Sequence, residues 1–392
     1  MKIVTRRVVT HIIPLLLFCA FLFPLCSPDK EVTGKIRLRW VKAYPAETWE
    51  NVQTGIFWSL SYLGATLDST YAKQIIQKED SVYFTLDLVK AGFDQHALNA
   101  FTVIIDSLRK SEEYKKYHAI DLSRFLVLTE HSSWHYYEIT GVAKTLSEFY
   151  KRHRATGDKE FHVYHSGVAK HQRNIRFVIG QGALDMAWIA EEGTGSLDSG
   201  TFTRKAYEVF DIMKNGQLRF AVYNEKGELL AGSPATHSAA GKPSKCIWCH
   251  ELVVQPLFFE TTEPVKGISV AAFGLLVDST QRQLENYRAQ LHSIIDFSKK
   301  QAHAQGELLY ISFMEPSAFR LANEWGTDTL QIKSRMRKST THVYEEFPFL
   351  GASYYRKETD SLSDYSIVPV PLSVREPLPG EPNYFYSTLP AK

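Results

Sequence analysis

The residues with the most distinctive chemistry in this chain are two cysteines and a histidine near position 248. Cys246, Cys249 and His250 form the pattern Cys-x-x-Cys-His. Two thiols at this spacing can add across the two vinyl groups of one porphyrin, and the adjacent imidazole can then donate an axial lone pair to the iron. The pattern predicts one covalently bound haem c, attached through both cysteines, with His250 as the proximal ligand.

Two other kinds of chemistry would use the same residues. A Cys-x-x-Cys pair can be a redox disulfide, but that interpretation needs a strand before the motif and a helix that opens on it. The preceding segment 233–243 is instead predicted to be a loop. A zinc ion is the second alternative, with His237 as a fourth ligand beside the three motif side chains. The adjacent side chains of Cys249 and His250 would bind one small ion awkwardly, which disfavours zinc.

The motif resembles the haem attachment site of c-type cytochromes. The resemblance covers residues 246–250 and the need for export, and the rest of the chain lies outside it. In small cytochromes c the motif lies near the start of a compact helical domain, whereas here it begins only at position 246. The resemblance implies haem binding and electron transfer, but not the small all-helical fold.

The start of the chain predicts export, which haem c attachment requires. Segment 2–7 is basic and segment 12–25 is almost wholly apolar, which is typical of a signal peptide over residues 1–25. The residues before Cys26 resemble a bacterial lipobox, although Leu25 stands where a small residue is expected. Lipidation at Cys26 would anchor the protein to a membrane, and an uncleaved anchor or another cleavage site are the alternatives. The expected location is the periplasm or the envelope membrane.

Composition limits the class of protein and its partners. Apolar residues make up 44% of the 392 residues and charged residues 22%, as in a folded soluble body. A net charge of +2, with no basic block, argues against a nucleic-acid partner. We expect three regions: the signal peptide, a helix-rich region over 26–158, and an α+β haem-bearing region over 159–392 with a proline-rich tail.

Hydrophobic periodicity predicts an α+β fold of mixed helices and antiparallel strands. The haem-bearing loop should follow a β-hairpin with strands at 218–223 and 228–230. The other predicted strands are 36–40, 82–88, 175–179, 268–277 and 308–313, and the predicted helices are 49–63, 94–108, 141–150, 183–189 and 284–298.

The sixth ligand of the iron decides what the haem can do. Met314 and His237 are the candidate ligands, and for both of them an ordinary structural role is the alternative. The pairs His131/His135 and His162/His165 could each bind a metal, or could simply be buried or capping side chains. No pattern of carboxylates predicts acid–base catalysis, so no catalytic residue is assigned.

Three functions remain open on sequence alone. The first is an exported bacterial monohaem protein that transfers electrons to redox partner proteins at the envelope. The second is a haem enzyme or sensor with an open axial site, suited to peroxidase, nitrogen-oxide or gas chemistry. The third is a lipoprotein without haem that acts as a binding module, with zinc or a disulfide at the motif. Whether the protein is an enzyme is left open by the sequence.

Overall fold

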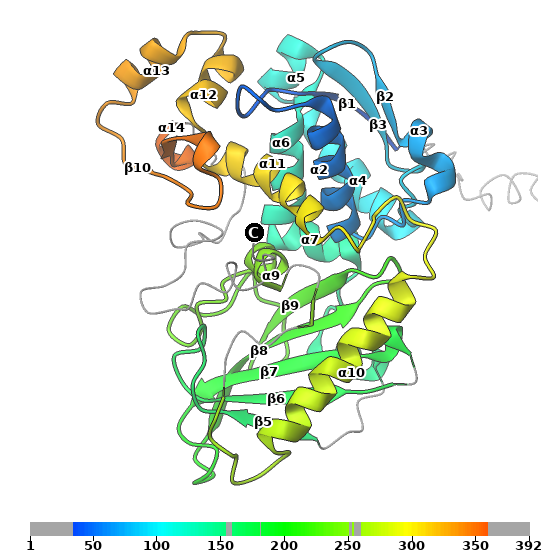
Figure 1. The fold of residues 1–392 in the computed structure, drawn as a ribbon, viewed down its shortest axis with the longest axis vertical. Coiled ribbons are helices and arrows are strands. Elements are labelled where there is room, and N and C mark those ends of the chain that lie inside the picture. The colour runs from blue at the N-terminus through cyan, green and yellow to red at the C-terminus, as the bar shows by residue number, and fades with distance from the viewer. Residues whose placement is uncertain (1–33, 154–158, 181, 251–252, 255–259, 360–392) are drawn as a thin grey trace, which may run out of the picture. The chain divides into compact units, whose positions relative to one another are not determined.

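The computed structural model describes residues 34–153, 159–180, 182–250, 253–254 and 260–359. The described residues from Lys35 onwards form one compact unit, with helices and mostly antiparallel sheets (Figure 1). The predicted α+β class is confirmed. The predicted signal peptide, Cys26, the proline-rich tail and the boundary at 158 lie outside the described residues. No helix within the described ranges combines the length and apolar character needed to cross a membrane.

The helices and strands are named as in Figure 1. The helices are α2 (Trp49–Tyr62), α3 (Ala72–Ile75), α4 (Gln95–Leu108), α5 (Glu112–Tyr117), α6 (Leu122–His131), α7 (Ser133–Thr140), α8 (Leu146–Arg152), α9 (Pro243–His250), α10 (Val270–Arg288), α11 (Ala304–Met314), α12 (Ala318–Trp325), α13 (Thr329–Arg335) and α14 (Arg356–Thr359). The strands are β1 (Lys35–Arg39), β2 (Ile76–Lys78), β3 (Tyr83–Asp87), β4 (Ile120–Asp121), β5 (Glu160–Val163), β6 (Arg173–Val178), β7 (Ala187–Thr194), β8 (Thr203–Ile212), β9 (Leu218–Asn224), β10 (Thr341–His342) and β11 (Ser353–Tyr354).

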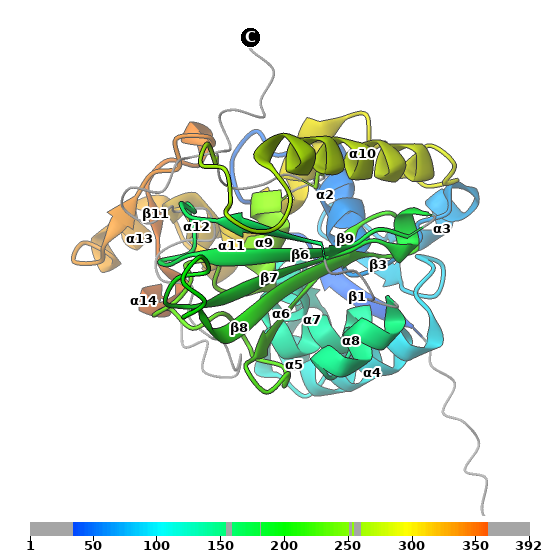
Figure 2. The same cartoon turned by 90° about the horizontal axis from the view of Figure 1, so that it is seen from below.

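The largest sheet is an antiparallel meander in the order β5-β6-β7-β8-β9. Side chains alternate between its two faces, so that residues paired across strands share a face. Trp188, Phe210 and Phe220 are paired in this way and form an aromatic row on one face. Helix α10 lies over one side of the sheet, and α7 and α8 lie on the other side (Figure 2).

Helix α7 covers the open edge of the sheet at β9. The backbone N–H groups of Phe220 and Val222 donate to the hydroxyls of Tyr136 and Tyr137, at 3.1 and 3.3 Å. An unpaired strand edge would otherwise expose its N–H groups to water or to another chain. The two tyrosines therefore complete the sheet and hold it against the helices.

A second, four-stranded sheet has the order β2-β3-β1-β4, with β1 and β4 parallel. Helix α11 packs against both α2 and α6 in the helical part of the unit. At the closest point Gly55 of α2 faces α11, and a Cβ added there would lie 2.6 Å from the carbonyl oxygen of Gln305. Elements from distant parts of the sequence thus form one core.

Two predicted helices of the N-terminal half are confirmed, and each begins with a side-chain cap. The hydroxyl of Thr48 accepts from the backbone N–H of Asn51 at the start of α2, and Asp94 accepts from Ala97 at the start of α4. Gly64, which follows α2 after one residue, has a φ of +99° that favours glycine. The strands predicted at 36–40 and 82–88 correspond to β1 and β3.

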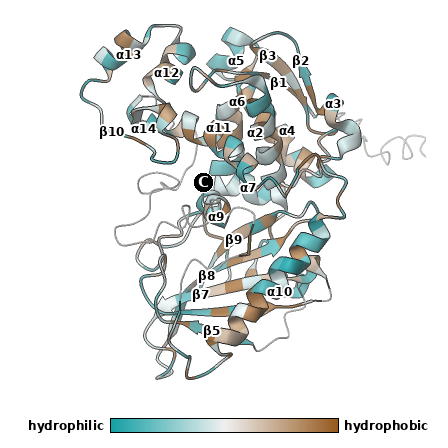
Figure 3. Cartoon of the chain, viewed as in Figure 1, coloured by the Kyte–Doolittle hydropathy of each residue, from teal (hydrophilic) through white to brown (hydrophobic). Residues whose placement is uncertain are grey.

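The prediction of a buried strand at 268–277 is wrong, because this segment forms the first half of α10. Figure 3 shows that this half of the helix is apolar and that the second half is hydrophilic. Phe273 packs against the sheet and is 6% exposed, whereas Leu275 is 69% exposed. The apolar run is therefore not a sign of burial on all sides. The helix predicted over 284–298 is also displaced, since α10 ends at Arg288.

The strand predicted at 308–313 is also wrong, because these residues lie in α11. Nearly the whole helix is buried, so it lacks the apolar and polar faces that reveal a helix in the sequence. The hairpin strand at 218–223 is confirmed as β9, and its return at 228–230 is joined to it by an isolated bridge between Tyr223 and Leu229. The helix predicted at 183–189 is a single 3-10 turn followed by β7, and the helix at 141–150 begins later, as α8.

Candidate cofactor site

The Cys-x-x-Cys-His motif lies on helix α9, where the sequence predicted a loop. Pro243 is the first residue of this helix. Proline is tolerated at this position because a backbone N–H there would have no partner within the helix, so the N–H that proline lacks is not missed. The helix packs against α6, α7 and β9. Residues separated by three or four positions share one side of a helix, so Cys246, Cys249 and His250 lie together. Ile247 and Trp248 are fully buried on the other side.

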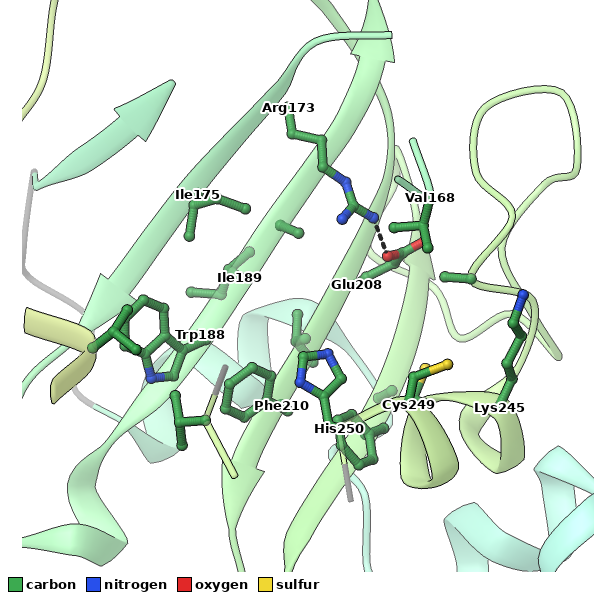
Figure 4. Close-up of a pocket in the computed structure, with 18 of the residues that line it drawn as sticks. Val168, Arg173, Ile175, Trp188, Ile189, Glu208, Phe210, Lys245, Cys249 and His250 are labelled. Atoms are coloured by element: carbon green, nitrogen blue, oxygen red, sulfur yellow. Dashed lines mark hydrogen bonds and ion pairs between the residues drawn. The ribbon is translucent and has the colours of Figure 1, made fainter. Parts of the chain in front are cut away.

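The motif side chains border a cavity of about 110 Å³ (Figure 4). This volume lies below the range of roughly 300–1,000 Å³ that is usual for cofactor sites, so a bound cofactor would require the wall to rearrange. Four strands of the large sheet, the first half of α10 and the end of α9 form its wall. The lining residues are Val168, Arg173, Ile175, Trp188, Ile189, Ala190, Glu208, Val209, Phe210, Phe220, Ala221, Ala240, Lys245, Cys246, Cys249, His250, Val254, Phe273 and Val277.

His250 projects from the end of α9 towards the aromatic row of the sheet (Figure 4). The centroid of its ring lies 5.5 Å from those of both Phe210 and Phe220. Its Nδ1 atom is buried and has no hydrogen-bond partner in the part of the chain that the structure describes. Burial, helped by the positive charge of Arg173, lowers the pKa of His250 to about 4. The imidazole is therefore neutral near pH 7 and keeps a lone pair for a metal.

Both motif cysteines are partly exposed, and both border the cavity. Burial raises the pKa of Cys246, and the nearby Glu208 and Cys249 raise it further. The Cys246 thiol is therefore protonated near pH 7 and is not a thiolate nucleophile in the folded protein.

A cluster of charges closes one end of the cavity. The guanidinium of Arg173 donates to Glu192 and, at 2.5 Å, to Glu208. Ser233 also donates to Glu208. Burial raises the pKa of Glu192 to about 8, so this carboxyl is protonated near neutral pH. A single ion pair between Arg173 and Glu208 then faces the cavity, with Lys245 nearby on the wall (Figure 4).

The two candidate sixth ligands lie away from the cavity wall. His237 is in the segment before α9, with its ring 6.1 Å from that of His171. Met314 is the last residue of α11 and does not line the cavity. The wall opposite the motif consists mostly of aliphatic and aromatic side chains, which do not ligate iron. Among the described residues no group of three or more His, Cys, Asp or Glu side chains is arranged to hold a metal ion.

The predicted histidine pairs are separated by the fold. His131 ends α6 and His135 belongs to α7, so the two residues do not share one helix as the four-residue spacing suggested. His162 is buried on β5, 3.5 Å from Glu160, whereas the side chain of His165 is largely exposed. His131 instead contacts Tyr310 and Lys242, on the side of α9 that faces away from the cavity.

Several residues of the site could not be recognised in the sequence. Arg173, Glu192 and Glu208 lie on three different strands and come together only through the register of the sheet. Strand β8, which carries Glu208, was not predicted at all. Its alternation of charged and apolar residues was the signal available.

Comparisons of the chain with protein-family models, with curated proteins and with solved structures gave no match.

Proposed function

We propose that this protein binds one haem c covalently through Cys246 and Cys249, with His250 as the proximal ligand of the iron. The observation that carries the proposal is that all three side chains border one cavity with a largely apolar wall. An apolar wall and a few polar groups at one end suit a porphyrin, which has a hydrophobic body and two carboxylates.

Each lining residue has a defined part in this proposal. His250 supplies a neutral imidazole, and the flanking rings of Phe210 and Phe220 restrict its orientation. Arg173 and Lys245 are the cations that would bind the porphyrin carboxylates. Trp188 and Phe273, whose ring centroids lie 5.9 Å apart, contribute apolar surface and exclude water. When bound, haem supplies one-electron chemistry and an iron that can hold a small ligand.

We further propose an iron with an open or weakly held sixth position, as in a haem enzyme or sensor. The support is the character of the described wall, where aliphatic residues such as Ile175, Ile189 and Val209 predominate. Side chains of this kind leave space for a small neutral molecule or a peroxide. Electron transfer to redox partner proteins is the second candidate, and the attachment motif itself favours it, because thioether bonds retain the haem in both redox states.

We also propose that the chain is exported to the periplasm or the envelope membrane, with lipidation at Cys26. The support is the basic and apolar pattern of residues 2–25. Export comes before haem c attachment, so the two proposals depend on each other.

A haem stain of the denatured protein tests the attachment. The chain is produced in a bacterial host with haem c maturation machinery, and we expect the pigment to survive denaturation because thioether bonds are covalent. The double variant Cys246→Ala/Cys249→Ala should lose all covalent pigment. Cys26→Ala is the matched control, since it removes a thiol outside the motif and should keep the pigment. Colourless protein from a competent host would overturn the proposal.

Carbon monoxide separates the two candidate functions. Mixed with the reduced haem protein, it should shift the visible spectrum rapidly, because an open or weakly held position binds the gas at once. An unchanged spectrum would mean that a strong sixth ligand is present, and electron transfer would then be the better assignment.

A further inference from the structure

A buried chain of polar side chains lies on the side of α9 that faces away from the cavity. The hydroxyl of Tyr310 is hydrogen-bonded to Nδ1 of His131, and Nε2 of the same ring lies 2.8 Å from Nζ of Lys242. The three residues come from α11, from the end of α6 and from the position just before α9. Each of them is at most 2% exposed. These contacts therefore exclude bulk water.

Both nitrogen bases of this chain are uncharged near pH 7. Burial lowers the pKa of Lys242 to about 6 and lowers that of His131 well below its ordinary value. In the tautomer of His131 that carries its proton on Nε2, the phenol of Tyr310 donates to Nδ1, and the N–H at Nε2 donates to the lone pair of the Lys242 amine. A proton that leaves Tyr310 can thus be replaced along the chain by a proton that reaches Lys242.

An aromatic side chain links Tyr310 to the attachment motif. Trp248 lies between the two motif cysteines in the sequence and is fully buried. The centroid of its ring is 5.9 Å from that of Tyr310 and 5.3 Å from that of Tyr62. Its Nε1 atom has no hydrogen-bond partner among the described residues. Because Trp248 is bonded to Cys249 through one peptide group, it forms a short route between Tyr310 and a haem attached at that cysteine.

We propose that Tyr310 is a redox-active residue that delivers an electron through Trp248 to the haem and gives its proton to His131. This inference rests on the proposed haem attachment and assigns a second chemical centre beside it. The oxidant that the step requires is a peroxide. The radical left on Tyr310 is the form that would oxidise a further substrate.

The step balances with hydrogen peroxide as oxidant. The peroxide takes up two electrons, together with two protons from solvent, and leaves as two water molecules. One electron comes from the haem, which starts in its reduced form and becomes oxidised, and the other comes from Tyr310. The O–H bond of Tyr310 breaks, its proton binds Nδ1 of His131, and the proton on Nε2 moves to Lys242, which becomes an ammonium group. His131 stays neutral because it gains and loses one proton.

Electron paramagnetic resonance of the haem protein, frozen shortly after mixing with hydrogen peroxide, tests the proposal. We expect an organic radical signal that narrows when the protein carries ring-deuterated tyrosine. The signal should be lost in Tyr310→Phe. The matched control is Tyr62→Phe, since Tyr62 is also buried and lies at a similar distance from Trp248, and it should keep the signal.

Two further variants keep the outcome decisive if Tyr310→Phe folds poorly. Trp248→Phe should reduce the yield of the tyrosyl signal because it replaces the ring on the electron route. Lys242→Met should do the same because it removes the final proton acceptor. A pigmented protein whose radical signal is absent, or is unchanged in Tyr310→Phe, would overturn the redox role of Tyr310 and leave the haem proposal standing. A protein without covalent pigment would overturn both.

Discussion

The two sides of helix α9 differ in what lies against them. On one side Cys246, Cys249 and His250 border a cavity of about 110 Å³. On the other side Ile247 and Trp248 are 1% and 0% exposed, in a tightly packed interior. A single helix of eight residues thus lies between a cavity and a close-packed core.

The difference shows how one short segment can combine reactivity and rigidity. Side chains that line the cavity can contact a ligand held there. Side chains on the packed side fix the position of the helix, since close-packed interiors tolerate little change of volume. The polar groups on that side, His131 and Lys242, bond to each other and stay neutral.

The largest expected effect on stability comes from the packed side. Trp248→Ala should lower the free energy of unfolding by about 3–5 kcal/mol, the usual cost of emptying a buried aromatic site. Urea unfolding of the haem-free protein measures it. Cys249→Ala on the cavity side is the control and should cost less than about 1 kcal/mol, because little packed volume is lost. Equal costs for the two variants would contradict the contrast between the sides.

A pH-dependent effect should come from Lys242 on the packed side. Its pKa is about 6 in the folded protein and 10.5 ordinarily, so between these values the unfolded chain binds one proton more. The stability of the natural chain then rises with pH, by up to about 1.4 kcal/mol per unit from Lys242 alone. Lys242→Met lacks this contribution, so its advantage over the natural chain should be largest near pH 6 and should shrink towards pH 10.

Urea unfolding of both proteins at several pH values checks this prediction. Taking the difference between variant and natural chain cancels the other titrating groups, including Glu130, whose pKa burial raises to about 8. Lys226→Met, on an exposed turn, should show a difference that does not vary with pH. A constant difference for Lys242→Met as well would show that the amine is not held neutral.

The smallest effects should come from the two candidate ligands that lie away from the cavity. His237→Ala and Met314→Leu should leave the visible spectrum of the haem protein unchanged, because neither residue lines the cavity wall. Spectra of the oxidised and reduced forms measure this. A changed position of the absorption bands in either variant would mean that the wall rearranges around the cofactor and that the residue reaches the iron.

Local patterns in the sequence succeeded where one local interaction decides the structure. The starts of α2 and α4 depend on Thr48 and Asp94, whose side chains bond to backbone groups three residues away. They failed at α10 and α11. One of these helices is half exposed and the other almost wholly buried, so the apolar residues of neither follow the usual helical face.

The amino-acid sequence by itself determined the chemical types at the site, because two thiols and an imidazole at fixed spacing are a property of five consecutive residues. Only the tertiary structure decided what surrounds them. The cavity, the pair of Arg173 with Glu208, and the contact of Tyr310 with His131 and Lys242 join elements that are distant along the chain. Burial in those surroundings sets which groups are neutral, and burial depends on the whole fold rather than on neighbours in the sequence.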